Sequence, residues 1–258
     1  AATGLWSFVE TSAPDGYCVD PTPKSVYVDV TEGDREYTVA AINYEKPDMK
    51  IIKTDAQTGA PISGTVLSIK SVTGSYSTSV TTGTDGSATL SAIPAGVYVV
   101  REESVPEPYI VSNTEQTVAL RPGKTSEVRF QDYQKPGLEI LKKNIATGEP
   151  IEGVTYLIEQ IDGSYSTSAT TDGAGRIFLD SIPVGSYRIT EKNVPSHVIL
   201  SEIPQEVHLE AGCTRTVTFF NAVKPSLTIL KRNSITGDYL ANAKFHIYYG
   251  SDNTTTGE

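Results

Sequence analysis

The strongest constraint on the fold of this chain is an internal repeat. Residues 47–135 align with residues 136–224 without a gap, and 36 of the 89 aligned positions are identical. The hexapeptide Gly-Ser-Tyr-Ser-Thr-Ser, for example, begins at Gly74 and again at Gly163. Self-similarity at a fixed period is typical of arrays in which each copy is one structural unit. We therefore expect a string of similar domains rather than one large domain.

Parts of two further copies flank this pair. The stretch from Leu227 to Lys231 repeats the pattern from Leu138 to Lys142, and the stretch from Gly4 to Glu10 matches that from Gly185 to Glu191. The sequence therefore predicts four units: the C-terminal half of a repeat at 1–46, complete repeats at 47–135 and 136–224, and the N-terminal part of a further repeat at 225–258.

Within a copy, the local signals are those of strands. Short stretches rich in Val, Ile, Thr, Tyr and Phe alternate with turn dipeptides such as Thr58-Gly59 and Asp85-Gly86. About seven strands in a unit of this length predict a two-sheet sandwich of the immunoglobulin-related kind. The expected fold class is therefore all-β, a tandem array of two-sheet sandwiches. Short linkers stiffened by proline, at Lys46-Pro47 and Lys135-Pro136, are expected to keep the string semi-rigid.

Alternation along the strands turns three polar residues of each complete repeat toward the core. Residues i and i+2 of a strand share a face, so Lys53 lies in phase with Met49 and Ile51. By the same argument a Glu and an Asp or Asn also face inward. The inward residues are Lys53, Glu102 and Asp132 in the first complete repeat, and Lys142, Glu191 and Asn221 in the second. The flanking units hold half-sites, with Glu10 and Asn43 in 1–46 and Lys231 in 225–258.

Such a triad has a specific chemistry. Burying three polar groups separately costs several kcal/mol each, so we expect them to converge. Desolvation lowers the pKa of an amine and raises that of a carboxyl group, which favours a free amine beside a protonated acid. A free amine is a nucleophile. Its attack on the Asn or Asp side chain, with the Glu moving the proton, would form an amide crosslink and release ammonia or water. The alternative is that the Lys and Asn reach solvent at strand ends and the Glu forms an ordinary salt bridge.

An ordered set of motifs accompanies the triad in the first complete repeat: Lys53, Thr58-Gly59, Pro61-Ile62-Ser63-Gly64, Gly96-Val97-Tyr98, Glu102 to Pro106 and Asp132. The second complete repeat carries the same set, ending at Asn221. This pattern resembles the Cna B-type repeats of Gram-positive surface adhesins, also found as SpaA-like pilin domains with a prealbumin-like sandwich. The resemblance implies spontaneous isopeptide bonds from Lys53 to Asp132 and from Lys142 to Asn221. It also implies catalytic roles for Glu102, Glu191 and, in the incomplete unit, Glu10.

The composition of the chain and several single residues exclude other classes of function. With 21 Lys and Arg against 31 Asp and Glu, the net charge is −10, which disfavours nucleic-acid binding. No apolar run is long enough to span a membrane. His197, His208 and His246 have no spacing typical of metal ligands, so neither a metal nor another cofactor is expected. In the Ser- and Thr-rich strands we find no nucleophile elbow or phosphate loop, so a conventional enzyme is the least favoured reading.

Two function classes remain. The first is a structural stalk of a cell-wall-attached, extracellular protein, whose export signal and anchor would lie outside this chain. Its partners would be neighbouring repeats of the same chain and, through a tip domain elsewhere, a host surface or matrix protein. The second is a module that itself binds a host matrix protein or glycan. Because binding loops tend to diverge and the two complete repeats align without insertions, the pattern favours the stalk.

Neither flanking unit can complete a triad or a core alone. The segment 1–46 holds Glu10 and Asn43 without the Lys, whereas 225–258 holds Lys231 without the Glu or Asn. Two explanations stay open at this point. The end of one chain docks with the start of another through Lys231 and Asn43, or the chain is part of a longer array.

Overall fold

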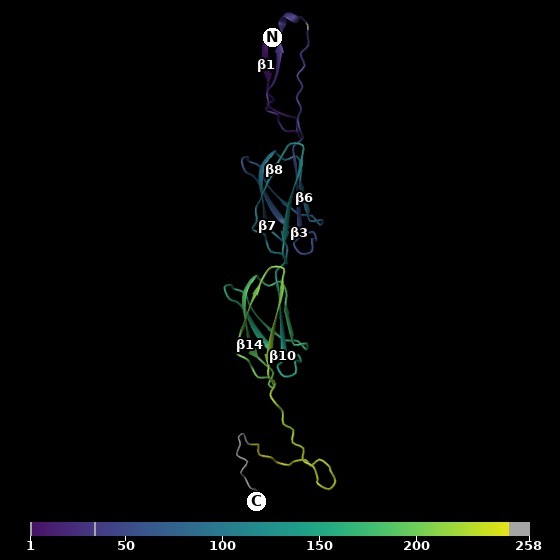
Figure 1. The fold of residues 1–258 in the computed structure, drawn as a ribbon, viewed down its shortest axis with the longest axis vertical. Helices are drawn as coiled ribbons and strands as arrows, with labels where there is room; N and C mark the ends of the chain where they lie inside the picture. Colours follow the sequence, from purple (N-terminus) through teal and green to yellow (C-terminus); the bar gives the residue numbers. More distant parts are fainter. Residues whose placement is uncertain (1, 34, 248–258) are drawn as a thin grey trace.

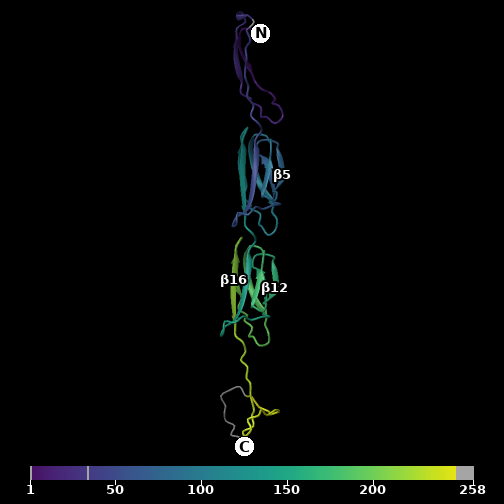
Figure 2. The same cartoon turned by 90° about the vertical axis from the view of Figure 1, so that its right-hand side faces the viewer.

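A computed structural model describes residues 2–33 and 35–247. These residues form strands and loops together with one short 3-10 helix, η1 (Val30–Glu32). Figure 1 shows two sandwiches in line, with the N-terminal segment at one end of the string and the C-terminal segment at the other. The view turned by 90° in Figure 2 shows the same linear arrangement. The predicted all-β array of tandem sandwiches is confirmed.

The first sandwich contains seven strands in two sheets. A three-stranded sheet has the order β6-β3-β9, and a four-stranded sheet has the order β5-β4-β7-β8. The strands are β3 (Asp48–Asp55), β4 (Val66–Ser71), β5 (Ser77–Thr81), β6 (Ser87–Leu90), β7 (Gly96–Ser104), β8 (Gln116–Leu120) and β9 (Thr125–Asp132).

The second sandwich has the same topology, with sheets β13-β10-β16 and β12-β11-β14-β15. Its strands are β10 (Gly137–Asn144), β11 (Thr155–Gln160), β12 (Ser166–Thr170), β13 (Arg176–Leu179), β14 (Gly185–Asn193), β15 (Gln205–Leu209) and β16 (Thr214–Asn221).

The first and last strands of each sandwich pair in parallel, whereas the other paired strands are antiparallel. In the first sandwich β3 and β9 run together from Asp48 opposite Thr125 to Asp55 opposite Asp132. Because these strands point the same way, the chain enters at one end of the sandwich and leaves at the other. This topology produces the linear string.

Hydrogen bonds between successive units repeat along the string. The Gly212 amide donates to the Gln134 carbonyl oxygen at 2.7 Å, and the Gly123 amide donates likewise to the Glu45 carbonyl oxygen. At the junction between the two sandwiches, the Gln57 side chain also donates to the Gly212 carbonyl oxygen at 2.7 Å. The prolines are therefore not the sole restraint on the junctions.

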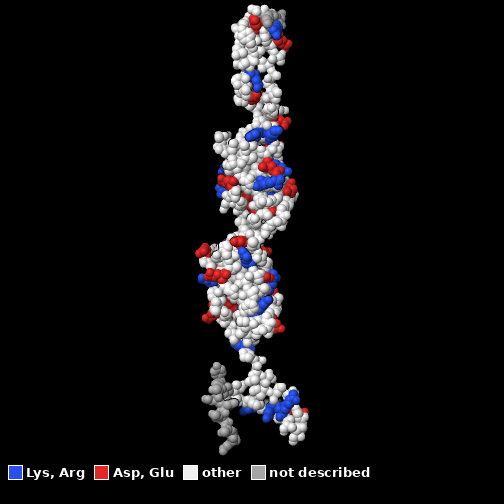
Figure 3. Space-filling model, viewed as in Figure 1, with Lys and Arg blue, Asp and Glu red and all other residues white. Residues whose placement is uncertain are grey.

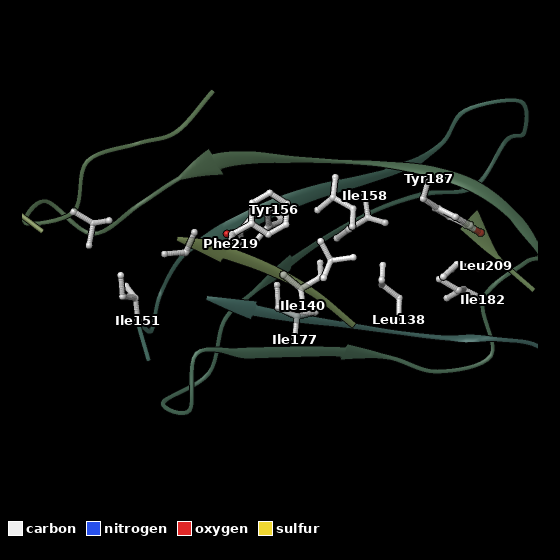
Figure 4. Close-up of a cluster of buried hydrophobic side chains, with 14 residues drawn as sticks. Leu138, Ile140, Ile151, Tyr156, Ile158, Ile177, Ile182, Tyr187, Leu209 and Phe219 are labelled. Carbon is white, nitrogen blue, oxygen red and sulfur yellow. The ribbon is translucent and has the colours of Figure 1, made fainter. Parts of the chain in front are cut away.

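The core of each sandwich follows the period-two pattern of its strands. In β10, for example, Leu138 and Ile140 are fully buried, and so are Tyr187 and Ile189 of the facing strand β14. Figure 4 shows Leu138, Ile140 and Tyr187 meeting between the two sheets of the second sandwich. The next inward position of β10 after Ile140 is Lys142, which brings a charged residue into this layer.

Two further observations concern the surface and the membrane. On the face drawn in Figure 3, Lys and Arg side chains over the two sandwiches are scattered among Asp and Glu. Among the described residues, no helix has the length and apolar character needed to cross a lipid bilayer.

The two terminal segments lack a closed core. In the N-terminal segment, β1 (Gly4–Phe8) and β2 (Lys24–Val28) form a hairpin, while residues 36–43, which correspond to β16, form no strand. Residues 226–233, which correspond to β10, also form no strand. In each complete sandwich the first and the last strand pair with each other. Each terminal segment contains only one of these two strands, so neither strand forms there. Predictions for Ala1 and for residues 248–258 lie outside the described residues.

The repeat alignment places Trp6 at the position of Tyr98 and Tyr187 and so predicts a buried aromatic side chain, but this prediction is wrong. Trp6 lies in phase with Phe8 and Glu10 and matches the buried Tyr187, yet its side chain is 43% exposed. The neighbouring residues Leu5 and Phe8 are also exposed, at 70% and 52%, so neither face of β1 packs into a core.

Candidate functional site

In the first sandwich, the three predicted polar residues meet in the core. Lys53 comes from β3, Glu102 from β7 and Asp132 from β9. The Lys53 Nζ atom lies 2.5 Å from Glu102 Oε1 and 2.5 Å from Asp132 Oδ1. All three side chains are fully shielded from solvent or nearly so. The alternative in which the Lys reaches solvent is therefore wrong for this repeat.

Strand register explains why these side chains meet. On the parallel pair β3 and β9, Lys53 lies opposite Phe130 and Asp55 lies opposite Asp132. Lys53 and Asp132 are therefore diagonal neighbours on the inward face of one sheet. Glu102 reaches them from the facing sheet, where Tyr98, Val100 and Glu102 alternate inward along β7.

The second sandwich brings together the equivalent residues. The Lys142 Nζ atom donates to Glu191 Oε2 at 2.5 Å, and the Asn221 amide donates to Glu191 Oε1, also at 2.5 Å. Each of the three side chains is at most 3% exposed. Here the Glu carboxylate bridges the other two groups, whereas in the first sandwich the Lys amine does so.

A backbone amide orients each glutamate. The Ser112 amide donates to Glu102 Oε2 and the Ser201 amide donates to Glu191 Oε1, both at 3.0 Å. In each case the donor lies ten residues after the Glu. The loop that follows the strand therefore fixes one carboxylate oxygen.

Several buried polar atoms at these sites lack a hydrogen-bond partner. Among the described residues, the six such atoms include five from the two triads: Lys53 Nζ, Glu102 Oε1, both Asp132 carboxylate oxygens and Asn221 Oδ1. In the first triad the ionic contacts are short, but their directions are not those of hydrogen bonds. An unpaired buried polar group is costly, so the unlinked form of each site carries a local energetic penalty.

Burial shifts the pKa of one group in each domain toward its neutral form. Desolvation raises the pKa of the Glu102 carboxyl group above its ordinary value, although the Lys53 amine opposes the shift. Desolvation likewise lowers the pKa of the Lys142 amine, against the opposing effect of the Glu191 carboxylate. These are the directions expected for a free amine beside a protonated carboxyl group.

Sequence reasoning missed two buried groups near the triads. The Tyr156 hydroxyl donates to Glu191 Oε2 at 3.2 Å, and the Tyr156 ring stacks at a tilt against Phe219 (Figure 4). The only sequence signal was a Tyr at a position where the first repeat has Leu67. Asp55, the next inward residue after Lys53, is also buried and accepts hydrogen bonds from the Gln57 and Thr58 amides.

The terminal half-sites remain apart. Glu10 and Asn43 are in contact, because the Asn43 amide donates to Glu10 Oε1 at 2.6 Å. Lys231 is exposed in the C-terminal segment and does not join them. Among the described residues, no cluster of His, Cys, Asp and Glu side chains has a geometry that would hold a metal ion.

A comparison of the sequence with known protein families assigns the two sandwiches to a family. The profile of the family described as SpaA, prealbumin-like fold domain, matches residues 47–134 and again residues 136–223. The chain belongs to this family. The resemblance drawn from the sequence motifs is therefore confirmed, and both sandwiches are SpaA domains.

Three solved structures illustrate the similarity in fold. The TIE protein of Bacillus anthracis is 20% identical, with a TM-score of 0.40, and the match covers 80% of this chain and 38% of that one. The minor pilin GBS52 of Streptococcus agalactiae is 17% identical, with a TM-score of 0.40 and coverage of 72% and 100%. The shaft pilin SpaA of Lactobacillus rhamnosus GG is 16% identical, with a TM-score of 0.42 and coverage of 70% and 99%. No curated protein sequence matches the chain.

Proposed function

We propose that this chain is part of a stalk on the surface of a Gram-positive cell, and that isopeptide bonds lock its two SpaA domains. The bonds would join Lys53 to Asp132 and Lys142 to Asn221, with Glu102 and Glu191 moving the protons. The complete domains would be the repeats 47–135 and 136–224, and the segments 1–46 and 225–258 would be parts of further domains. The protein would not be an enzyme beyond this single turnover.

The observation that carries the proposal is the convergence of a Lys, a Glu and an Asp or Asn in each core. The Lys53 amine already lies within 2.5 Å of an Asp132 carboxylate oxygen. Holding reacting groups in contact removes most of the entropic cost of a bimolecular reaction. Amide formation would also remove the charges whose burial is unfavourable, which gives the reaction a driving force within the folded domain.

In the second domain, the reaction would proceed from a neutral Lys142. Its Nζ atom attacks Cγ of Asn221, an amide C–N bond forms, and the bond from Cγ to Nδ2 breaks. The protonated Glu191 carboxyl group donates its proton to Nδ2, which leaves as ammonia, and takes up the proton that Nζ loses. In the first domain, Lys53 Nζ attacks Cγ of Asp132 in the same way, one C–O bond of Asp132 breaks, and its oxygen leaves as water with one proton from Nζ and one from Glu102.

The position of the bonds suits a load-bearing role. Each bond would tie the first strand of a domain to the last, the two strands through which the chain enters and leaves. Tension along the string would then pass through the covalent bond and bypass most of the sandwich. The expected setting is outside the cell and attached to the wall, with neighbouring repeats as partners and a host protein contacted through a tip domain elsewhere.

Single-molecule pulling tests this role. A chain stretched from its two ends is expected to show no extension step for the 79-residue spans enclosed by the two bonds. In the matched double variant Lys53→Ala and Lys142→Ala, both domains should extend fully. Full extension of the unmodified chain would contradict the stalk mechanism.

A further inference from the structure

A third carboxylate lies beside the crosslinking site of the first domain. Asp55 ends β3 directly opposite Asp132, the last residue of β9, and both side chains are buried in the core. Neighbouring strands are about 4.8 Å apart, whereas facing sheets are about 10 Å apart, so Asp55 is nearer to Asp132 than to Glu102 of the facing sheet. Both charges also act on the nearby Tyr109 hydroxyl, because desolvation raises the pKa of Tyr109 and the charges of Asp55 and Asp132 raise it further.

The hydrogen bonds of Asp55 keep its carboxylate ionised. Its Oδ1 atom accepts from the Gln57 amide at 2.8 Å and from the Thr58 amide at 2.9 Å. Its Oδ2 atom accepts from the Gln134 side chain at 3.1 Å. These donors, the Thr58 amide above all, lower the pKa of Asp55 to about 2 although burial opposes the shift. Asp55 therefore carries a negative charge at neutral pH.

Asp132 lacks such donors. Within the part of the chain that the structure describes, neither of its carboxylate oxygens has a hydrogen-bond partner, and its contact with Lys53 is ionic. A negative charge on Asp132 thus lies buried, without donors, and beside the charge of Asp55. Like charges repel strongly in a protein interior, where water screens them weakly. A negative charge is therefore better accommodated on Asp55 than on Asp132.

The crosslinking step of the first domain moves this charge. Lys53 Nζ attacks Cγ of Asp132, the amide C–N bond forms, one C–O bond breaks, and the oxygen leaves as water with one proton from Nζ and one from Glu102. The negative charge is on Asp132 before the step and on Glu102 after it. At Glu102 the Ser112 amide already donates to Oε2 at 3.0 Å. The charge thus leaves the vicinity of Asp55 and arrives at a carboxylate that has a backbone donor.

The second domain differs at the same position. Its acceptor is Asn221, and the residue opposite Asn221 at the end of β10 is Asn144. Because Glu191 gives one proton and takes up another when ammonia leaves, no charge moves between residues. The Asn144 side chain still accepts from the Ala146 amide at 2.9 Å, which preserves the turn. The residue opposite the acceptor is therefore charged only in the domain where the step moves a charge.

The polar surroundings of Asp55 are also specific to the first domain. Gln134, which donates to Asp55, corresponds to Val223 in the second domain, and Tyr109 corresponds to Val198. The backbone is the same in both places, since Tyr109 pairs with Gln134 as Val198 pairs with Val223. The two domains thus differ here in side chains and not in fold.

We propose that Asp55 is a positioning residue for the water-releasing crosslink, and that the residue at this position is matched to the acceptor. The inference rests on the crosslinking chemistry proposed above. Asp55 acts through Asp132, because its charge destabilises the charge on Asp132 and so favours the transfer to Glu102. A carboxylate at this position suits an Asp acceptor, and a neutral amide suits an Asn acceptor.

The test measures how fast each bond forms in the whole chain. Short pulses of labelled cell-free synthesis, sampled over time and stopped in denaturant, give chains of known age. Digestion and mass spectrometry then measure the fraction with Lys53 joined to Asp132 and the fraction with Lys142 joined to Asn221. The second bond is an internal clock, because both domains are made and folded in the same sample.

Asp55→Asn removes the charge and keeps the turn, as Asn144 does in the second domain. Relative to the clock, the bond to Asp132 should form about tenfold more slowly, which is the scale of one like-charge contact in a protein interior. Glu127→Gln, which removes an exposed carboxylate from β9, is the matched control and should leave the ratio unchanged. An unchanged or increased ratio in Asp55→Asn would overturn the inference.

A change of acceptor distinguishes this role from a structural one. In a chain with Asp132→Asn the first bond would release ammonia and move no charge, so adding Asp55→Asn should not slow it. A purely structural role of Asp55 would slow the bond equally with either acceptor, and equal slowing would overturn the inference.

The second domain allows the reverse test without any change at Asp55. A chain with Asn221→Asp should form its second bond slowly, timed against the unchanged first bond. Adding Asn144→Asp should accelerate the second bond by about tenfold, by the same like-charge contact. No acceleration would overturn the matching of this position to the acceptor.

The same measurements separate this inference from the proposed function. Absence of both linked peptide pairs from the unmodified chain would overturn the proposed function and the inference with it. Both bonds present, with the rate of the first bond indifferent to Asp55→Asn, would overturn the inference alone.

Discussion

The Lys53 Nζ atom lies 2.5 Å from Asp132 Oδ1, although the two residues are 79 positions apart in the sequence. The contact joins the first strand of a sandwich to the last. A covalent bond at this point would close nearly the whole domain into one loop. In the unfolded state such a loop loses much of its chain entropy, so the bond would favour the folded domain.

The first prediction concerns this stabilisation in the second domain. Asn221→Ala removes the electrophile and leaves residues 142 and 221 unlinked. By the loop-closure relation, the free energy of unfolding of this domain should fall by roughly 4.5 kcal/mol, and further because Glu191 loses a donor. Chemical denaturation followed by hydrogen exchange in residues 136–224 measures the change. A loss below about 1 kcal/mol would indicate that no crosslink existed.

The second prediction concerns the proton carrier. Glu191→Gln should leave the second domain folded but unlinked, because Lys142 and Asn221 stay close while the carboxyl group that moves the proton is lost. Glu206→Gln, a change at an exposed glutamate on β15, is the matched control and should leave the bond intact. Formation of the bond in Glu191→Gln at the normal rate would exclude the proposed role of Glu191. The bond in the first domain should form in both variants.

The third prediction is a pH dependence with a definite sign. In the Asn221→Ala chain Lys142 stays an amine, and burial lowers its pKa below the ordinary 10.5. Where the folded pKa is below the unfolded one, the unfolded state binds more protons, so stability rises with pH. The denaturation midpoint of this domain should therefore rise as the pH increases toward 10.5, the ordinary pKa of the amine, and should level off above it. In the unmodified chain Lys142 would be an amide, and this rise should be absent.

The fourth prediction concerns Tyr156, whose hydroxyl donates to Glu191. Tyr156→Phe removes one hydrogen bond to the carboxyl group, and the free energy of unfolding of the second domain should fall by about 1 kcal/mol. The bond from Lys142 to Asn221 should still form, because the first domain has Leu67 at this position. Absence of the bond in this variant would make Tyr156 a required member of the site.

The sequence predicted most of the fold and the location of the triads, for reasons visible in single strands. Alternation along β3 is unbroken from Met49 to Lys53, so the inward direction of the lysine follows from its apolar neighbours. The repeat added a second instance of each inward residue at the same spacing. The pattern is present in both copies although 53 of their 89 aligned positions differ.

What the sequence did not predict depends on contacts between strands. The hydrogen bond from Tyr156 to Glu191 requires the register of β11 against β14, which no local pattern specifies. The exposure of Trp6 depends on whether a first strand covers β1, and alternation carries no information on that point. The same dependence explains why residues 36–43 form no strand despite their alternating sequence.

The most direct test of the central claim is the intact mass of the denatured chain, followed by sequencing of its linked peptides. The account predicts a mass below that of the sequence by one ammonia and one water. It also predicts one peptide pair joining Lys142 to Asn221 and another joining Lys53 to Asp132. An intact mass equal to that of the sequence, with all four residues recovered in separate linear peptides, would contradict the account.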